Sequence, residues 1–185
     1  GDVLAVGAMK AGAVYLYRVG SDGAVSFIDK VVAEDGSTGD QFGYSVSQSD
    51  NLLAVGAALS DSAGKTDAGA AYVYRIETNG TATFLCKVTA PDGAANDRFG
   101  ISVSQSGNRL AVGALNAEAG NISAAGAIYL YKVEIDGSAT YLTKVTAPDA
   151  AASDFGGKSV SQSGDLLAVG AYQADPGGLA DAGAA

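Results

Sequence analysis

Aspartate residues recur in pairs along the chain, and they are the side chains best suited to chemistry. The members of a pair lie five residues apart in polar segments between apolar runs: Asp35 and Asp40, Asp92 and Asp97, and Asp149 and Asp154. Carboxylates supplied from one loop suit a hard cation such as calcium, which takes six to eight oxygen ligands. The same carboxylates could instead accept hydrogen bonds from loop amides in Asx-type turns. The absence of a compact DxDxDG spacing favours this second interpretation.

A second set of aspartates repeats less regularly. Asp61 with Asp67, and Asp175 with Asp181, lie six residues apart in two of the four repeated units. We therefore rank this set below the first as ligand-binding or cation-binding residues. Calcium is the one cofactor that the sequence suggests, and it is suggested only at these aspartates.

Catalytic side chains of other kinds are scarce. The chain has no histidine and no phosphate-cradling loop, and its one cysteine, Cys86, has no base partner in the sequence. By repeat phase Cys86 corresponds to Asp29 and Thr143, so we expect a solvent-facing thiol with no catalytic role. The sequence predicts a protein that is not an enzyme.

Charge and hydropathy limit the partners. The formal net charge is −9, and the 11 basic residues are scattered, so a nucleic acid would be repelled. The chain lacks an apolar run of the roughly 18 to 20 residues that span a bilayer, and its first residues lack the pattern of a signal peptide. We expect neither nucleic-acid binding nor membrane insertion.

The elements that must position these aspartates repeat along the chain. The sequence LAVGA occurs at 4–8, 53–57, 110–114 and 167–171, and the last two intervals are both 57 residues. Each unit holds four short strand-like runs, joined in two places by turn dipeptides such as Asp50-Asn51 and Asn79-Gly80. Tight hairpins join antiparallel neighbours, so each unit is predicted to be a four-stranded antiparallel sheet.

Stacked four-stranded units predict an all-β fold built of β-propeller blades, with a linear β-solenoid as the competing arrangement. We expect a single repeat domain over 1–185, with a partial blade at 1–33, blades at 34–90 and 91–147, and a partial blade at 148–185. These are too few strands for a closed ring. We therefore expect either further sequence to complete the ring or neighbouring molecules to cover its open edges.

The repeated motifs resemble the FG-GAP repeats of integrin α-subunit propellers. The resemblance rests on Phe42-Gly43 and Phe99-Gly100, on VGA at 55–57 and 112–114, and on GAxYxY from Gly12, Gly69 and Gly126. The GAP proline is absent, and in the fourth unit Phe155 is displaced by one position. The calcium loop that integrins carry between the first two strands is here a bare hairpin turn, so that calcium site does not transfer.

Strand alternation places the two long connections of every unit at one end of its blade. They are the loops after VGA, at 58–68, 115–125 and 172–182, and the inter-blade loops at 33–41, 90–98 and 147–154. Long polar loops on a rigid scaffold are where binding usually resides, and the resemblance also implies ligand binding on this face.

Three further features have predicted roles. Paired tyrosines two residues apart are expected to pack between blades, with a sugar-binding aromatic ladder as the alternative; they are Tyr15 and Tyr17, Tyr72 and Tyr74, and Tyr129 and Tyr131. Lys30, Lys87 and Lys144 are expected to guard the outer edge strand. The sequons at Asn79 and Asn121 are expected to be exposed and to be candidate N-glycosylation sites.

These features predict an extracellular or cell-surface propeller module that recognises a protein or glycan ligand in adhesion. The alternative is a structural subunit of an extracellular filament, sheath or appendage, in which the partners are copies of the chain itself.

Overall fold

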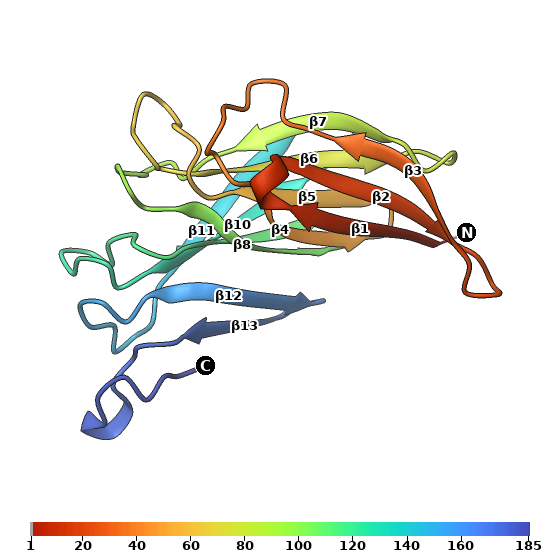
Figure 1. The fold of residues 1–185 in the computed structure, drawn as a ribbon. Coiled ribbons are helices and arrows are strands. Elements are labelled where there is room, and N and C mark those ends of the chain that lie inside the picture. The colour runs from red at the N-terminus through yellow and green to blue at the C-terminus, as the bar shows by residue number, and fades with distance from the viewer. Residues whose placement is uncertain (1) are drawn as a thin grey trace.

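The computed structural model describes residues 2–185, and within them the chain is built of antiparallel sheets (Figure 1). The first sheet, blade 1, has three strands, and blades 2 and 3 have four strands each. Blade 4 has two strands. Two 3₁₀ turns, η1 (Met9–Ala11) and η2 (Pro176–Gly178), interrupt the loops. The strands are β1 (Asp2–Ala8), β2 (Ala13–Val19) and β3 (Val25–Val31) in blade 1; β4 (Phe42–Ser49), β5 (Leu52–Ala57), β6 (Ala70–Ile76) and β7 (Ala82–Val88) in blade 2; β8 (Phe99–Ser106), β9 (Arg109–Ala114), β10 (Ala127–Val133) and β11 (Ala139–Val145) in blade 3; and β12 (Gly156–Ser163) and β13 (Leu166–Ala171) in blade 4.

This arrangement confirms the predicted fold class. In each sheet the strands follow chain order, and every hydrogen-bonded pair is antiparallel, as tight hairpin turns require. The innermost strands β4, β8 and β12 lie side by side, and the blades fan out from them (Figure 1). None of the sheets formed by residues 2–185 closes on itself.

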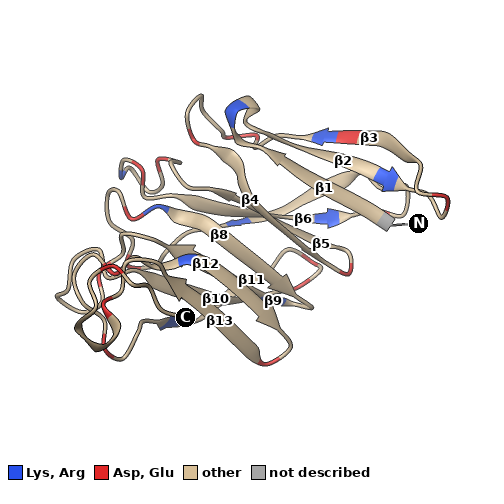
Figure 2. Cartoon of the chain, turned by 60° about the horizontal axis from the view of Figure 1, so that its bottom comes forward, with Lys and Arg blue, Asp and Glu red and all other residues tan. Residues whose placement is uncertain are grey.

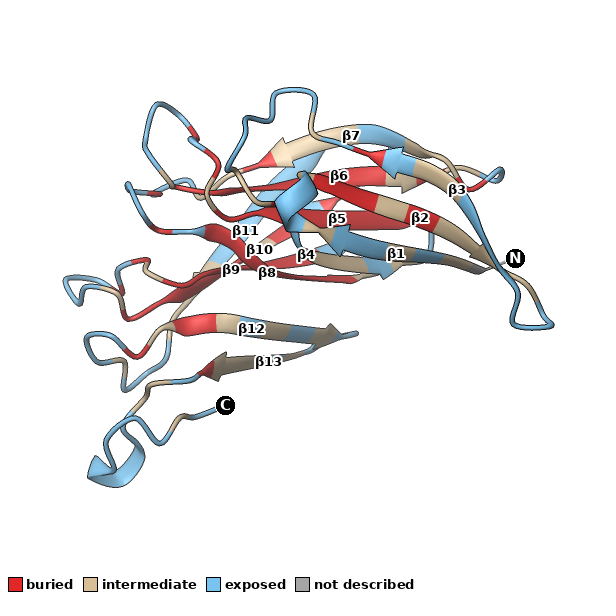
Figure 3. Cartoon of the chain, in the orientation of Figure 1, coloured by how far each residue is buried: buried red, intermediate tan, exposed pale blue. Residues whose placement is uncertain are grey.

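The paired tyrosines of blades 2 and 3 pack between blades, as predicted, whereas Tyr15 and Tyr17 are half-buried and contact Phe27 within blade 1. Tyr72 and Tyr74 of blade 2 are buried in a cluster with Val14 and Leu16 of blade 1. The ring of Phe42 meets the Tyr72 ring edge-on, with the centroids 5.4 Å apart. A second cluster joins blades 2 and 3 in the same way, through Tyr129, Tyr131 and Phe99. The core is thus a series of inter-blade layers, and Figure 3 shows most buried positions in blades 2 and 3.

The glycines of the repeated motifs lie where two blades approach most closely. Gly100 of the Phe-Gly motif has φ +90°, a left-handed conformation that favours glycine. Its carbonyl oxygen faces Gly56 of the preceding VGA motif, and a Cβ atom added to Gly56 would lie 2.0 Å from that oxygen. The same relation joins Gly113 to the oxygen of Gly157, again at 2.0 Å. The two motifs therefore form one contact between successive blades.

The displaced Phe155 has a different partner from its counterparts. Gly156 takes the strand position that Phe42 and Phe99 hold in the other units. Phe155 precedes the strand with φ +54° and stacks on Tyr172, with ring centroids 5.7 Å apart. The shift by one position thus moves the aromatic ring from the inter-blade core to the loop end of blade 4.

One expectation about the outer strands is wrong. Cys86 is half-buried and packs against the core between blades 2 and 3, and burial raises the pKa of its thiol. Asp29 is likewise half-buried and accepts a hydrogen bond from the Ala82 amide of the next blade, whereas Thr143 is exposed beside the two-stranded blade 4. Lys87 and Lys144 do lie on the outer edge strands of their sheets, and each also forms an ion pair with an inter-blade loop.

Candidate functional site: the long-loop face

The long loops gather at one end of the blades, which we call the long-loop face. It comprises the segments 33–41, 58–68, 90–98, 115–125, 147–155 and 172–182, and the tight hairpin turns lie at the opposite end (Figure 1). Figure 2 shows that the acidic residues lie mostly in these loops and in the hairpin turns. The blades therefore present the predicted aspartates on one face.

The first aspartate of a pair fastens its loop to the following blade. The carboxylate of Asp92 accepts a hydrogen bond from the Tyr129 hydroxyl at 2.7 Å and an ion-paired hydrogen bond from Lys144 Nζ, also at 2.7 Å. Lys144 Nζ lies 5.2 Å from the centroid of the Tyr129 ring, within cation–π range. Burial alone would raise the pKa of Asp92, but the bonds from Lys144 and Tyr129 outweigh it and lower that pKa.

Asp35 repeats this arrangement one unit earlier. Its carboxylate accepts from the Tyr72 hydroxyl at 2.9 Å and from Lys87 Nζ at 2.7 Å. The hydrogen bond from Lys87 is the main cause that lowers the pKa of Asp35. Burial raises the pKa of the Tyr72 hydroxyl, so tyrosine is the neutral donor in the pair. The third member of the set, Asp149, is exposed.

The second aspartate of a pair holds its own loop closed. The carboxylate of Asp97 accepts from the Ala94 amide at 2.8 Å, and that of Asp154 accepts from the Ala151 amide at 2.7 Å. Asp40 accepts from the Ser37 amide in the same way. Asp97 is 6% exposed, and this burial raises the pKa of its carboxyl group.

The two aspartates of a pair therefore bind different partners. Tyrosine, lysine and backbone amides occupy their oxygens, whereas calcium requires a shell of six to eight oxygens. Among residues 2–185, the side chains of His, Cys, Asp and Glu form no group of three or more that could hold a metal ion. As arranged here, the pairs do not fit a calcium site.

The second set closes the loops that follow VGA. The Asp61 carboxylate accepts from the Asp67 amide at 2.9 Å, and the Asp175 carboxylate accepts from the Asp181 amide at 2.7 Å. Repeat phase places Glu118 between them, 57 residues after Asp61 and 57 before Asp175. Sequence reasoning missed Glu118 because only aspartates were compared, although the repeat phase alone would have found it.

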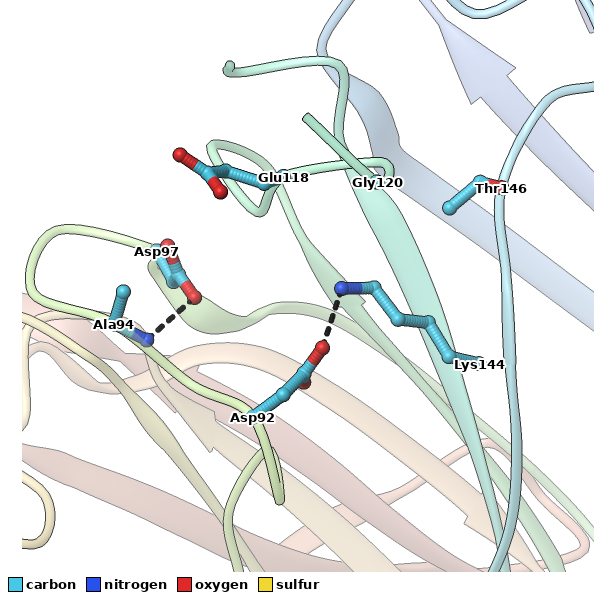
Figure 4. Close-up of a pocket in the computed structure, with 7 residues that line it drawn as sticks. All are labelled: Asp92, Ala94, Asp97, Glu118, Gly120, Lys144 and Thr146. Atoms are coloured by element: carbon cyan, nitrogen blue, oxygen red, sulfur yellow. Dashed lines mark hydrogen bonds and ion pairs between the residues drawn. The ribbon is translucent and has the colours of Figure 1, made fainter. Parts of the chain in front are cut away.

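A cavity of the long-loop face lies in the third unit. It has a volume of about 450 Å³ and lies between Asp97 and Glu118 on one side and Lys144, which is ion-paired with Asp92, on the other (Figure 4). The structure thus brings two predicted aspartates together with two residues that were not predicted as site residues. Three carboxylates and one ammonium group give the cavity a net negative lining, which suits ligands with hydroxyl, amide or cationic groups. The arrangement can therefore hold a polar ligand by hydrogen bonds and charge.

Both sequons lie on the surface, as expected. Asn79 is exposed in the hairpin turn between β6 and β7, and Asn121 is exposed in the loop after β9. The Asn79 side chain accepts from the Thr81 amide and hydroxyl at 3.0 and 2.8 Å, which orders the turn.

Comparisons with known proteins agree on the repeat. A family model described as FG-GAP repeat matches residues 25–74, 83–131 and 140–185. A crystal structure of a protein from Lactobacillus plantarum is similar to this chain over 94% of its residues, with a TM-score of 0.52 and 17% sequence identity. At this identity the similarity concerns the fold alone. The chain spans about half of that protein, 51% of its length. The search of curated proteins gave no match.

One further finding bears on membranes. Among the described residues, no helix is long and apolar enough to cross a bilayer.

Proposed function

Since the chain belongs to the FG-GAP repeat family, we propose that it is an extracellular or cell-surface recognition module, and not an enzyme, that binds a protein or glycan ligand through its long-loop face. The observation that carries the proposal is the polar cavity on that face. It lies beside a loop that Asp92 holds to the following blade and that Asp97 closes on itself, so its lining is fixed before a ligand arrives. A preformed lining lowers the ordering cost of binding.

The extracellular location is part of the same proposal. Exposed sequons at Asn79 and Asn121 support it, because N-glycosylation requires accessible asparagines in the secretory pathway. Adhesion is the role that fits a module whose repeated blades all present loops to one side.

The test is binding of the purified chain to a printed glycan array and to a panel of purified extracellular matrix proteins. Glu118→Lys reverses an exposed charge at the cavity, and Asp165→Lys makes the same change in the β12–β13 hairpin at the opposite end. We expect Glu118→Lys to weaken a selective interaction at least tenfold and Asp165→Lys to leave it unchanged. Equal losses in the two variants, or no selective binding on either panel, would contradict recognition by the long-loop face.

A second candidate function is a structural subunit whose copies join blade to blade. Large apolar side chains are exposed at both ends of the blade series, with Phe27 in blade 1 59% exposed and Leu166 in blade 4 78% exposed. Light scattering of the native particle separates the two functions. A discrete species supports the recognition module, whereas large heterogeneous particles at all concentrations support the structural subunit.

A further inference from the structure

Two of the three inter-blade loops are held by backbone hydrogen bonds to the loop that follows VGA in the preceding blade. Three amides at the end of the inter-blade loop donate to three consecutive carbonyl groups, which we call the strap. The bonds between blades 2 and 3 are Asn96 N to Thr66 O at 2.9 Å, Arg98 N to Asp67 O at 3.2 Å, and Phe99 N to Ala68 O at 2.9 Å. Those between blades 3 and 4 are Ser153 N to Ser123 O at 3.3 Å, Phe155 N to Ala124 O at 3.2 Å, and Gly156 N to Ala125 O at 2.8 Å.

The first unit lacks the residues that form a strap. The interval between the first two LAVGA sequences is 49 residues, eight fewer than the later intervals of 57. The eight missing residues correspond to 60–67 of the second unit, and the 3₁₀ turn η1 joins β1 to β2 in their place. Both strands that flank this short connection are described, so its length is a property of the first unit itself.

The amides that would meet a strap are nevertheless held in place. They belong to Gly39, Gln41 and Phe42, which lie 57 residues before the donors of the next unit. The Asp40 carboxylate closes this loop on a backbone amide, as its counterpart does in the next unit. Gln41 has φ +60°, close to the +57° of Arg98. The loop therefore keeps its conformation without the strap.

These amides receive no acceptor from the short connection. Among residues 2–185, no group accepts a hydrogen bond from the Gly39 or Gln41 amide, and Phe42 makes no bond to Ala11, which holds the last strap position. A Cβ atom added to Gly12 would meet nothing within 4 Å, whereas at the equivalent glycine of the second unit it would lie 2.5 Å from an amide nitrogen of β8. The space that a strap fills elsewhere is therefore open here.

A cavity of about 320 Å³ occupies this space, and we call it the blade 1 cavity. Gly39, Gln41 and Phe42 all line it, together with η1 and Lys10. Lys10 is exposed, and it is the only charged residue among the described residues of the lining. The cavity thus combines backbone amide donors with an ammonium group, in contrast to the carboxylate-lined cavity of the third unit.

We propose that the blade 1 cavity binds an oxyanion, a carboxylate or sulfate group, through the amides of Gly39 and Gln41 and the ammonium group of Lys10. Unpaired amides of a loop with a fixed conformation form anion-binding concavities, and their hydrogen bonds to an anion are stronger than those to a neutral carbonyl group. The charge of Lys10 favours an anion over a neutral acceptor. The site is separate from the cavity of the third unit and does not depend on the proposed function.

The first test follows the isotope-labelled whole chain by NMR during titration with sodium sulfate, sodium acetate and sodium glucuronate, while sodium chloride keeps the ionic strength constant. We expect saturable shifts of the Gly39 and Gln41 amides and none of their counterparts Asn96 and Arg98, which already donate to a strap. Tighter binding of glucuronate than of acetate identifies an acidic sugar as the source of the oxyanion, and equal binding identifies a free anion. Both results support the site.

A matched pair of lysine variants isolates the charge. Lys10→Gln should weaken binding about two- to fivefold, the effect expected of an ion pair at an exposed site. Lys65→Gln changes an exposed lysine of the second unit, whose ammonium group bonds to the Gly93 carbonyl oxygen beside a loop that a strap already holds. We expect Lys65→Gln to leave the titration unchanged.

A loop graft tests the missing strap directly. Insertion of SDSAGKTD, a copy of residues 60–67, between Lys10 and Ala11 gives the first unit the length of the second. We expect the graft to abolish the anion-induced shifts and to slow amide hydrogen exchange at Gly39 and Gln41, which should be fast in the unmodified chain. The proposal is overturned if none of the three anions shifts these amides, if Lys10→Gln and Lys65→Gln have equal effects, or if both amides already exchange slowly in the unmodified chain.

Discussion

The close approach of glycines between blades leads to a quantitative prediction. A Cβ atom at Gly113 would lie 2.0 Å from the Gly157 carbonyl oxygen, so the two strands must separate by about 1 Å before that contact reaches even 3.0 Å. Both strands are held by backbone pairing on their other sides, which leaves little freedom to move. Overpacking of this kind costs about 3 kcal/mol, the upper part of its usual range. We expect Gly113→Ala to lower the melting temperature by roughly 6 to 12 °C.

Two other VGA glycines are the controls for this prediction. At Gly170 an added Cβ would approach the Ser159 side chain and no carbonyl group of another blade, so Gly170→Ala should cost less than about 1 kcal/mol. At Gly7, also in an end blade, the Cβ would lie 2.2 Å from Gly43 O, so Gly7→Ala should cost nearly as much as Gly113→Ala. Thermal and urea unfolding followed by tyrosine circular dichroism measure the three costs. A Gly7→Ala cost as small as that of Gly170→Ala would refute the contact argument and indicate that end blades simply unfold locally.

Four further predictions concern two carboxyl groups, aromatic packing and the thiol. The folded-state pKa of Asp92 is lowered, so its charge stabilises the fold above the unfolded pKa, near 3.8, and this stability is lost as pH falls through the folded value. Asp92→Asn should therefore destabilise the fold at pH 7, and the effect should shrink as the pH of the urea titrations falls below 3.8. The folded-state pKa of Asp97 is raised, so the stability that its protonated carboxyl group contributes is lost as pH rises through that value. Asp97→Asn should therefore be neutral or stabilising at pH 7. Below pH 4 the chain with Asp97 should become more stable relative to the Asp97→Asn variant. Phe99→Ala should cost about 3 to 5 kcal/mol because Phe99 is fully buried, whereas Phe155→Ala at the loop end should cost roughly 1 kcal/mol in the same titrations. Cys86 should react with iodoacetamide at pH 8 much more slowly in the folded chain than in 6 M urea, and equal rates would contradict its burial.

Much of the fold could be predicted because its signals are local. Turn dipeptides such as Asp50-Asn51 fix antiparallel neighbours, and the 57-residue phase shows that the same sheet recurs. The role of the tyrosine pairs also followed from the pattern, since two large rings on one strand face need a covering surface. Cys86 was misplaced because its burial depends on the neighbouring blade and not on β7 itself.

The site was less predictable because its contacts are distant in sequence. Asp35 bonds to Tyr72 and Lys87, which follow it by 37 and 52 residues, and nothing in the loop sequence names those partners. The sequence therefore suggested loop-amide hydrogen bonds or a metal ligand for Asp35, and did not show its ion pair with Lys87. The alternating serines of β4 raised the same difficulty, because alternation predicts a strand but does not show which neighbour its polar face meets.

The differences between repeats indicate where specificity arises. Asp92 bonds to the following blade as Asp35 does, so these bonds set the position of a loop and change little from unit to unit. At the loop tip the units diverge, since the Asp61 carboxylate closes its loop on a backbone amide, whereas the Glu118 carboxylate makes no such bond among the described residues. The longer side chain lines the 450 Å³ cavity instead. A change of one residue type at a tip can therefore leave a carboxylate free to line a cavity without disturbing the blades, because the loop is held at its base.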